Sequence, residues 1–296
     1  MKRKSTKRKL FGILLTIVFC LSVLSPVAPA KAEITGNDSL ANAYIHGLWS
    51  NTYTDTTIIA ENQEAAYYKF TVNKGDRIFA RVSYNNNLAG MSVDLLNSAG
   101  IQIDTTANVH DPDSVIPFMA INCDGIKDGQ TFYLRINRGT VDPSKAMYVS
   151  YSFRNRIRTG SKAFNISGTA SNPGNNPYNV AGVDSSVLTI NLTNNTQIPN
   201  EAIVEKVTTS GTQSPSQGGV RHKIMPSNPG GWYTSIVKNA SSGSYNISLS
   251  DGIEAKQIWK FKYNATAGAA STMKNVKVTL YWEYDLSNTG YKIFIP

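Results

Sequence analysis

The feature that most constrains this sequence is an alternation of apolar and polar residues with a period of two. The clearest case is the segment 276–284, where every even position is Val, Leu, Trp or Tyr and Lys277 begins the opposite row. Side chains alternate between the two faces of a β-strand but recur about every 3.6 residues on a helix, so this spacing predicts a strand. After residue 32, only 38–44 is predicted to form a short turn of helix.

The alternating runs are short, are bounded by Asn, Gly, Asp and Ser, and fall into two groups, which is typical of antiparallel sandwiches. In the first group we expect strands at 66–72, 78–82, 91–96, 101–104, 115–121, 131–137 and 147–153. In the second group we expect strands at 187–192, 202–209, 220–225, 232–237, 244–249, 258–263 and 276–284. A stretch rich in Ser, Asn, Gly and Pro separates the two groups. The predicted fold is all-β, with two jelly-roll-like β-sandwich domains in tandem at 33–160 and 183–296 and a linker or long loop at 161–182.

The first 32 residues have the three parts of a secretory signal peptide. Six basic residues lie within 2–9, an apolar run follows at 10–24, and Ala30-Lys31-Ala32 provides a cleavage site. The apolar run is shorter than the roughly 18 residues of a membrane-spanning helix. We therefore expect a cleaved signal peptide at 1–32, a secreted, extracellular protein and no membrane span in the mature chain.

The charge of the chain argues against two classes of partner. The formal net charge is +9, but residues 1–32 contain seven basic residues and no acidic one, so cleavage lowers the charge to +2. The basic excess that would suggest nucleic acid or an anionic membrane belongs mostly to the export signal. We expect neither partner. The remaining basic cluster, Arg154, Arg156 and Arg158, is more typical of a solvated strand end than of an anion site.

The sequence contains no recognisable catalytic signature. Its three histidines, His46, His110 and His222, are scattered, and zinc-protease, nucleophile-elbow and phosphate-loop motifs are absent. His222 shares a face with apolar neighbours, which predicts a half-buried, hydrogen-bonded side chain. Cys123 is the one cysteine after residue 32, so it has no disulfide partner, and we expect it to be a small buried hydrophobe. A pair of carboxylates for glycoside cleavage stays open, because the fold sets their separation.

Four segments of the first half occur in an order that resembles the bacterial pre-peptidase C-terminal domain. They are Asn37-Asp38-Ser39 with Ala41 and Ala43, followed by 67–76, 93–100 and 129–137. The resemblance covers residues 34–153. It implies a small β-sandwich of the kind attached to secreted hydrolases, with a noncatalytic role: binding an insoluble or polymeric target, or helping secretion and folding.

Some members of that group bind calcium, and the resemblance implies which residues would do so here. Asn37 and Asp38 match the first part of the site, and Glu61 and Glu64 stand near Ala66, which replaces the usual aspartate. Calcium takes about six to eight oxygen ligands, so several carboxylates must converge. The alternative role for Asp38 is that of a cap or turn residue. Calcium is the only cofactor that we consider.

The second half faintly resembles the P domain that follows subtilisin-type catalytic domains, at 198–204, 226–231 and 259–282. This implies a jelly roll. Within it, two glycines precede Trp232 and Tyr233 and could hold both rings at a loop rim, where aromatic faces bind sugar rings or protein side chains. The alternative is simple packing, which is usual for aromatic residues at the start of a strand.

Three functions are consistent with these observations. The favoured one is a secreted noncatalytic binding or accessory protein that acts on extracellular polymeric material, such as cell wall, polysaccharide or a protein matrix. The alternatives are a secreted hydrolase with an unrecognised site, and a matrix or surface protein that self-associates through sheet edges such as 274–284. The oligomeric state does not follow from the sequence.

Overall fold

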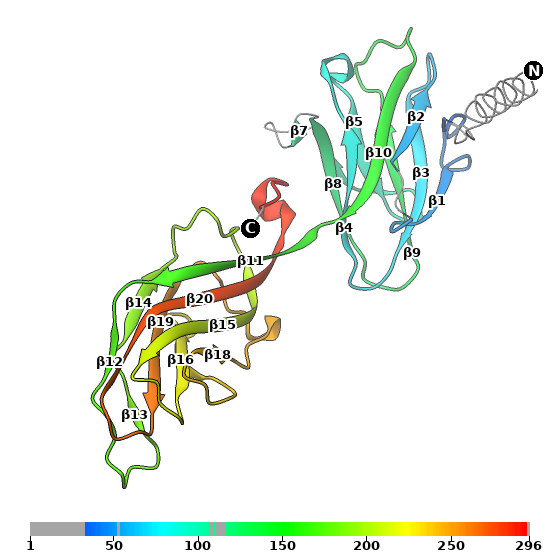
Figure 1. Cartoon of the computed structure of the whole chain (residues 1–296). Coiled ribbons are helices and arrows are strands. Elements are labelled where there is room, and N and C mark those ends of the chain that lie inside the picture. The colour runs from blue at the N-terminus through cyan, green and yellow to red at the C-terminus, as the bar shows by residue number, and fades with distance from the viewer. Residues whose placement is uncertain (1–32, 52–53, 107–108, 111–116, 295–296) are drawn as a thin grey trace, which may run out of the picture.

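The alternating segments form the strands of two β-sandwiches that are joined end to end, as the computed structural model shows (Figure 1). The structure describes residues 33–294, apart from 52–53, 107–108 and 111–116. The helices of this described part are three short 3-10 turns, η1 (Asn86–Leu88), η2 (Leu249–Asp251) and η3 (Leu286–Thr289). The all-β prediction is therefore confirmed. The predicted signal peptide at 1–32 lies outside the described residues.

The N-terminal sandwich, residues 33–156, consists of two five-stranded sheets. The first has the order β1 (Tyr44–Leu48), β3 (Ala65–Val72), β9 (Gln130–Asn137), β5 (Ser92–Leu96) and β6 (Gln102–Thr106). The second has the order β2 (Asp55–Ile59), β10 (Met147–Asn155), β4 (Arg77–Ser83), β8 (Phe118–Asp124) and β7 (Val109–His110). Strands β1 and β3 are parallel, and the other neighbours in both sheets are antiparallel.

The C-terminal sandwich, residues 157–294, also has two sheets of five strands. One has the order β11 (Ile157–Ile166), β20 (Ser271–Asp285), β15 (Ile203–Ser214) and β18 (Ser242–Ser244), with β12 (Ala170–Asn172) also on β20. The other, which we call the outer sheet, has the order β13 (Val183–Asp184), β19 (Ile258–Ala265), β16 (Arg221–Pro226) and β17 (Tyr233–Thr234), with β14 (Leu188–Asn191) also on β19. All of these pairs are antiparallel.

Each sandwich buries its own aromatic core. In the N-terminal sandwich, the rings of Tyr68 and Tyr151 lie 4.2 Å apart between centroids, and those of Phe70 and Phe153 lie 4.3 Å apart. In the C-terminal sandwich, the buried rings of β19 and β20 include Trp259, Phe261, Tyr263, Trp282 and Tyr284. Such rings each bury about 150–250 Å² and contribute much of the apolar burial that stabilises a sandwich.

The structure corrects the predicted linker at 161–182. Strand β11 runs from Ile157 to Ile166 and pairs along its whole length with β20. Strand β12 also pairs with β20, over three residues. The segment that was predicted to separate the domains is thus part of the second one. Its Ser, Asn and Gly content reflects an edge strand and the ordered loop that follows it, in which Asn175 donates to the carbonyls of Asn179 and Thr266.

Three further predictions are corrected. Residues 38–44 form a turn and not a helix, because the side chain of Asp38 accepts from Asn42 and the chain then pairs with β3 from Tyr44 onward. The strands predicted at 232–237 and 244–249 are reduced to the short β17 and β18. Strand β20 lies between β11 and β15, so the segment 274–284 offers no free edge for self-association.

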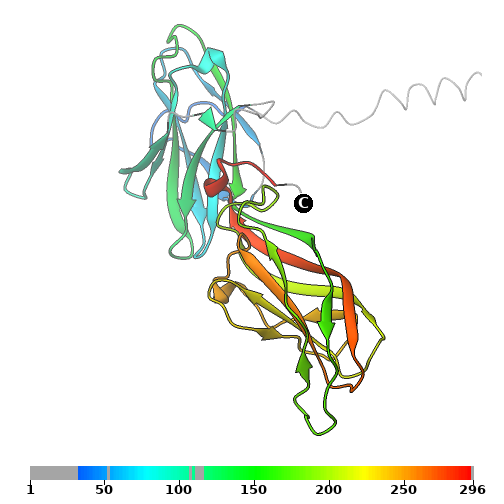
Figure 2. The ribbon, with the colours of Figure 1, turned by 90° about the vertical axis from the view of Figure 1, so that its left-hand side faces the viewer.

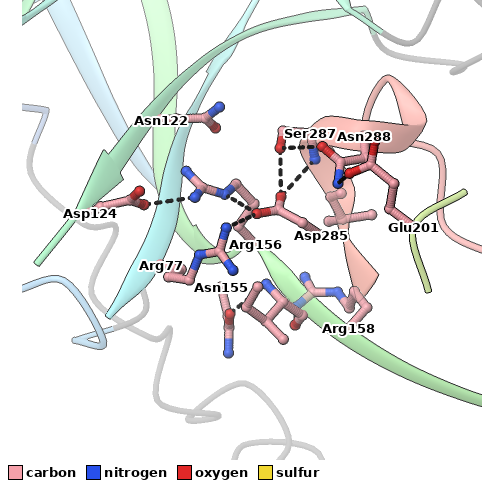
Figure 3. Close-up of polar contacts among 12 residues, drawn as sticks. Arg77, Asn122, Asp124, Asn155, Arg156, Arg158, Glu201, Asp285, Ser287 and Asn288 are labelled. Carbon is pink, nitrogen blue, oxygen red and sulfur yellow. Dashed lines mark hydrogen bonds and ion pairs between the residues drawn. The ribbon is translucent and has the colours of Figure 1, made fainter. Parts of the chain in front are cut away.

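The two sandwiches meet at Arg156, the single residue between β10 and β11 (Figure 3). Its backbone N–H donates to the carbonyl of Arg77 in the N-terminal sandwich, and its carbonyl accepts from the N–H of Leu286 in the C-terminal one. Its guanidinium contacts the carboxylates of Asp124, at 2.7 Å, and Asp285, at 2.8 Å, one from each sandwich. Arg156 is 4% exposed, so this residue joins the two bodies through both its backbone and its side chain.

The chain after β20 adds a second connection between the sandwiches. It turns back from the C-terminal sandwich onto the N-terminal one (Figure 2). Tyr291 packs its ring 4.9 Å from that of Phe79 and 6.1 Å from that of Phe118, and its hydroxyl donates to Asn122 at 2.6 Å. We call the contacts of Arg156 and Tyr291 together the junction.

Candidate ligand-binding face

The outward side of the outer sheet is unusually basic. The buried residues His222 and Ile224 of β16 point to the core, so the residues between and beside them point outward, and β19 alternates in the same way. In the five strands of this sheet, Asp184 is the one acidic residue. We define the Trp232 face by these outward side chains: Asp184, Arg221, Lys223, Trp232, Lys260 and Lys262.

Trp232 is held at this face by the loop between β16 and β17. Gly230 and Gly231 have φ values of +83° and +88°, a left-handed conformation that glycine adopts readily. The loop is anchored upstream, where the side-chain oxygen of buried Gln257 accepts from the N–H of Asn228 at 2.7 Å. Trp232 itself is half-buried, and the ammonium of Lys262 lies 4.2 Å from the centroid of its ring. This is a cation–π contact, so the indole ring of Trp232 and the positive charge of Lys262 lie next to each other on the surface.

Asp184 ties two lysines of neighbouring strands together. Its two carboxylate oxygens accept from the Nζ atoms of Lys223, at 2.8 Å, and Lys262, at 2.6 Å. A third contact comes from Asn264, its partner in the ladder. Partial burial raises the pKa of Asp184, but the hydrogen bonds from the two lysines and Asn264 outweigh it and bring the pKa to about 2. Asp184 is therefore ionised at any ordinary pH.

The Trp232 face nevertheless keeps an excess of positive charge. Lys223 and Lys262 stand directly opposite each other in the ladder, where like charges destabilise a sheet. Lys260 precedes Lys262 by two residues on β19. Arg221 precedes Lys223 by two residues on β16 and donates to the carbonyl of Ser235 at 2.6 Å. One carboxylate thus stands against four cations, and the face is suited to an anionic group.

The two aromatic residues that were predicted to bind a ligand, Trp232 and Tyr233, lie on opposite sides of the outer sheet. Trp232 lies on the outward side against Lys262. Tyr233 is paired with Ile224 and packs against the hydrophobic core of the C-terminal sandwich. The lysines of this face were missed by the sequence analysis, although their spacing at 260 and 262 and the position of Lys223 on the next strand carried the signal.

The residues predicted to bind calcium are not gathered in one place by their contacts. Asn37 is buried and its amide donates to the carbonyl of Tyr67 at 3.0 Å. Asp38 is exposed and accepts from Asn42, and Glu61 and Glu64 are also exposed. Within the described ranges, no group of three or more His, Cys, Asp or Glu side chains is placed to hold a metal ion. Calcium binding stays a prediction.

Near Asn37, the N-terminal sandwich contains a buried polar cluster that sequence analysis did not find. Nδ1 of His46 lies 3.5 Å from the carboxylate of Asp55, and the hydroxyl of Tyr151 lies 3.3 Å from both groups. Burial raises the pKa of Tyr151, and it raises that of the neighbouring Tyr68 to about 12. These groups contact one another in the interior and connect β1, β2 and β10.

His222 is also an interior residue, and it is fully buried where half-burial was predicted. Its ring contacts the hydroxyl of Thr209 at 2.9 Å and the carbonyl of Ala240 at 3.4 Å. Burial lowers its pKa to about 4. Among the residues that the structure describes, the hydrogen-bond partners of His222 are Thr209 and Ala240, and neither provides a carboxylate.

Two further residues considered in the sequence analysis, Cys123 and Arg156, are buried. Cys123 is buried with 3% exposure, and burial raises its pKa to about 12, which disfavours the reactive thiolate. Arg156 is buried at the junction and is not part of a solvated strand end, so that interpretation is corrected for this residue. Arg154 is exposed. Three glutamates, Glu201, Glu254 and Glu283, line one hollow beside the junction.

Comparison with other sequences gives one informative relative. The protein YbdN of Bacillus subtilis (strain 168), described as uncharacterized, is 39% identical over 277 residues, which cover 94% of this chain and 96% of that protein. This chain belongs to the YbdN family. No family model matches the chain. The YbdN relationship thus extends over both sandwiches and names no activity.

Comparison with solved structures gives weaker likenesses, at low sequence identity and low TM-score. The pre-peptidase C-terminal domain of a collagenase from Bacillus anthracis is 14% identical, and the match covers 42% of this chain and 99% of that one, with a TM-score of 0.27. A tandem of CBM22 domains from Paenibacillus barcinonensis Xyn10C is 10% identical over 77% of this chain and 91% of that one, with a TM-score of 0.29. Similarity at this level identifies no ligand and no activity for a YbdN family member.

In the part of the chain that the structure describes, no helix is long and apolar enough to cross a membrane.

Proposed function

We propose that this protein is a secreted, noncatalytic binding protein that holds extracellular polymeric material, such as cell wall, polysaccharide or a protein matrix, on its Trp232 face. The observation that carries the proposal is the placement of Trp232. Its ring is fixed at the surface of the outer sheet by two glycines, and it is accompanied by Lys262 at 4.2 Å. The signal peptide that the sequence predicts at 1–32 supports a role outside the cell.

The physical basis is the match between an indole ring and a sugar or a side chain. A flat aromatic ring offers a large apolar surface, and its neighbouring polar groups give orientation. Because the loop from Pro226 to Gly231 is anchored through Gln257, little ordering of Trp232 is needed when a ligand binds. A rigid ring with polar neighbours is what a binding module requires, and such a site needs no reacting group.

The first prediction tests this proposal by retention of residues 33–296 on insoluble matrices: bacterial cell wall, cellulose, chitin and collagen. We expect at least one matrix to retain the protein and Trp232→Ala to weaken the binding about ten-fold or more, because aromatic anchors dominate such contacts. The assay is a depletion isotherm, run with and without a chelator so that the calcium prediction is tested at the same time.

The matched control is Tyr148→Ala, which removes a ring that is 59% exposed on the N-terminal sandwich. It should leave retention unchanged. If no matrix retains the protein, or if both substitutions act alike, the Trp232 face is not the binding site. Turnover of a matrix during the assay that depends on Glu201, Glu254 or Glu283 would favour the hydrolase alternative instead.

A further inference from the structure

The Trp232 face carries a more specific inference, which rests on the proposed function. We infer that its ligand is an acidic polysaccharide, a sugar polymer with carboxylate or phosphodiester groups, and that the acidic group of the ligand binds Lys223 and Lys262 beside or in place of Asp184. The geometry of the three charged side chains and of the indole points to this class of ligand.

The first step is the position of the two lysines. Lys223 and Lys262 are directly opposite each other on adjacent antiparallel strands, which places two ammonium groups side by side. Such a pair is unfavourable in a sheet unless an anion lies between the two groups. Local conflicts of this kind are expected where a protein keeps a residue for function and not for stability. The lysine pair is thus a preformed anion site, and the carboxylate of Asp184 occupies it.

The second step is the accessibility of that occupant. The side chain of Asp184 is 31% exposed, and those of Lys223 and Lys262 are 22% and 16% exposed. All three can be reached from solvent, yet they are shielded enough for charge–charge interactions to exceed those in bulk water. Each lysine Nζ carries three protons for hydrogen bonding, so both can donate to a second oxygen without breaking the contact to Asp184.

The third step is the coupling of charge to the aromatic ring. The ammonium of Lys262 donates to Asp184 and also lies over the indole ring of Trp232, so the anion site and the stacking surface share one residue. An acidic sugar has the same two features within one unit, an apolar ring face and a charged group. A neutral sugar would use Trp232 and leave the lysine pair unused.

The fourth step is the extent of the face. The ladder places Arg221 beside Asn264, Lys223 beside Lys262, and Met225 beside Lys260. These levels are two residues apart, so basic groups recur about every 7 Å over roughly 13 Å along the strands. A row of this length fits a chain with repeating negative charges better than a single small anion.

The experiment measures binding to matched pairs of soluble polymers by isothermal titration calorimetry. Polygalacturonate is compared with its fully methyl-esterified form, and phosphomannan with neutral mannan. We expect the acidic member of at least one pair to bind at least about ten-fold more tightly, with an affinity that falls as salt rises, since the Debye length is only about 8 Å at 0.15 M salt. The two pairs distinguish carboxylate from phosphodiester.

Two substitutions report on the mechanism. Lys223→Gln should weaken binding of the acidic polymer about five-fold or more and reduce its salt dependence. Asp184→Asn should strengthen binding a few-fold and make it more salt-dependent, because it removes the internal competitor for the lysines. The matched control is Lys277→Gln, an exposed lysine on β20 of the other sheet, which should change neither. Thermal unfolding of each variant confirms that it is folded.

The outcomes separate this inference from the proposed function. Equal binding of acidic and neutral polymers, with Lys223→Gln unchanged and Trp232→Ala weakened, would overturn the acidic class and leave the binding function in place. Loss of affinity in Asp184→Asn would overturn the competitor role of Asp184. Tighter binding of double-stranded DNA or of anionic lipid vesicles than of either acidic polymer would also overturn the inference.

Discussion

At the scale of single residues, His222 shows how the C-terminal sandwich accommodates a polar group in its core. The carbonyl of Ala240 can only accept, so Nε2 of His222 is the nitrogen that carries the proton. Nδ1 then accepts from the hydroxyl of Thr209, which in turn accepts from the hydroxyl of Tyr245 at 2.7 Å. The three side chains and the carbonyl of Ala240 thus form one chain of hydrogen bonds, in which the imidazole is neutral.

This chain of hydrogen bonds leads to a prediction about pH. The pKa of His222 is about 4 in the folded protein and 6.5 in its unperturbed state. Between these values the unfolded chain binds more protons than the folded one, so the free energy of unfolding should decrease as the pH falls from 6.5 to 4. The full loss is about 3 kcal/mol, and above pH 6.5 the contribution of His222 is constant. Urea unfolding at several pH values measures it.

The control for the pH prediction is His222→Gln, which cannot titrate. The variant starts from a lower stability because the site is tightly packed, but its free energy of unfolding should vary less between pH 6.5 and 4 than that of the wild type. If both proteins show the same slope, another group is responsible for the acid sensitivity.

The residue scale also shows what the sequence could predict about the site. Trp232 was found because two glycines before an aromatic residue form a local signal. Asp184 was not found, because it lies 39 residues from Lys223 in the chain. The contact between these two side chains depends on which strands become neighbours in the sheet. The lysines were missed because a basic residue in the polar row of a strand does not by itself indicate a site.

At the scale of elements, the pairing of β11 with β20 depends on a glycine. Gly160 lies opposite Trp282, and a Cβ atom at this position would be 2.8 Å from Nε1 of the indole and 3.1 Å from Cε2. The indole is almost fully buried, so it has little room to move. The glycine therefore provides the space that the largest ring of β20 occupies.

We predict that Gly160→Val destabilises the protein by about 1–3 kcal/mol, because the added atoms overpack the site against Trp282. Thermal or urea unfolding followed by tryptophan fluorescence measures the change. Ala163→Val on the same strand is the control: this position is exposed, and the substitution should change the stability by less than about 0.5 kcal/mol. A Gly160→Val variant as stable as the control would show that Trp282 repacks at no cost.

Most long strands were predicted from the sequence, and β11 shows why some were not. The residues of β11 that face β20 on the core side include Arg158, Gly160 and Lys162 before Phe164. An edge strand needs apolar side chains only where the sandwich covers it, and long basic side chains can lie along the rim with their charges in water. The alternation is therefore lost in the first half of β11, and the segment has the composition of a linker.

At the scale of the whole molecule, the junction determines how the two sandwiches are held. Asp285 has 7% exposure, and one of its carboxylate oxygens accepts from Arg77 and Arg156 together, at 2.7 and 2.8 Å (Figure 3). Burial raises the pKa of this carboxyl, but the contacts with Ser287 and Arg156 outweigh it and lower the pKa. The carboxylate thus stays charged between the two arginines.

We predict that Asp285→Asn loosens the junction, because it leaves the buried guanidinium of Arg156 with one carboxylate fewer. Losing one partner of a buried ion pair typically costs about 3–5 kcal/mol. Differential scanning calorimetry should show one shared transition for the wild type and two separate transitions for Asp285→Asn. Small-angle scattering should show a broader distribution of distances between the sandwiches in the variant.

Asp142→Asn is the matched control for the junction prediction. Asp142 pairs with Lys145 in an exposed i,i+3 contact of 3.8 Å, and such surface pairs contribute at most about 1 kcal/mol. The control should keep the transitions and the scattering profile of the wild type. Unchanged calorimetry and scattering in Asp285→Asn would mean that Tyr291 and the continuous backbone suffice to hold the sandwiches together.

The relative position of the two sandwiches could not be predicted from the sequence. Arg156 looks like any basic residue at the end of a strand, and its burial follows from Asp124 and Asp285, which lie 32 residues before it and 129 residues after it in the chain. Tyr291 likewise lies 169 residues from Asn122. Long-range pairs of this kind leave no local pattern.

The single residue between β10 and β11 has a consequence for how the protein resists proteolysis. Proteases cut flexible, exposed segments that can be drawn out into their active sites, and the boundary between two domains is usually such a segment. Here that boundary is Arg156, whose N–H and carbonyl are both hydrogen-bonded and whose side chain is buried. A protease thus meets no flexible, exposed segment at Arg156, where cleavage would separate the two sandwiches.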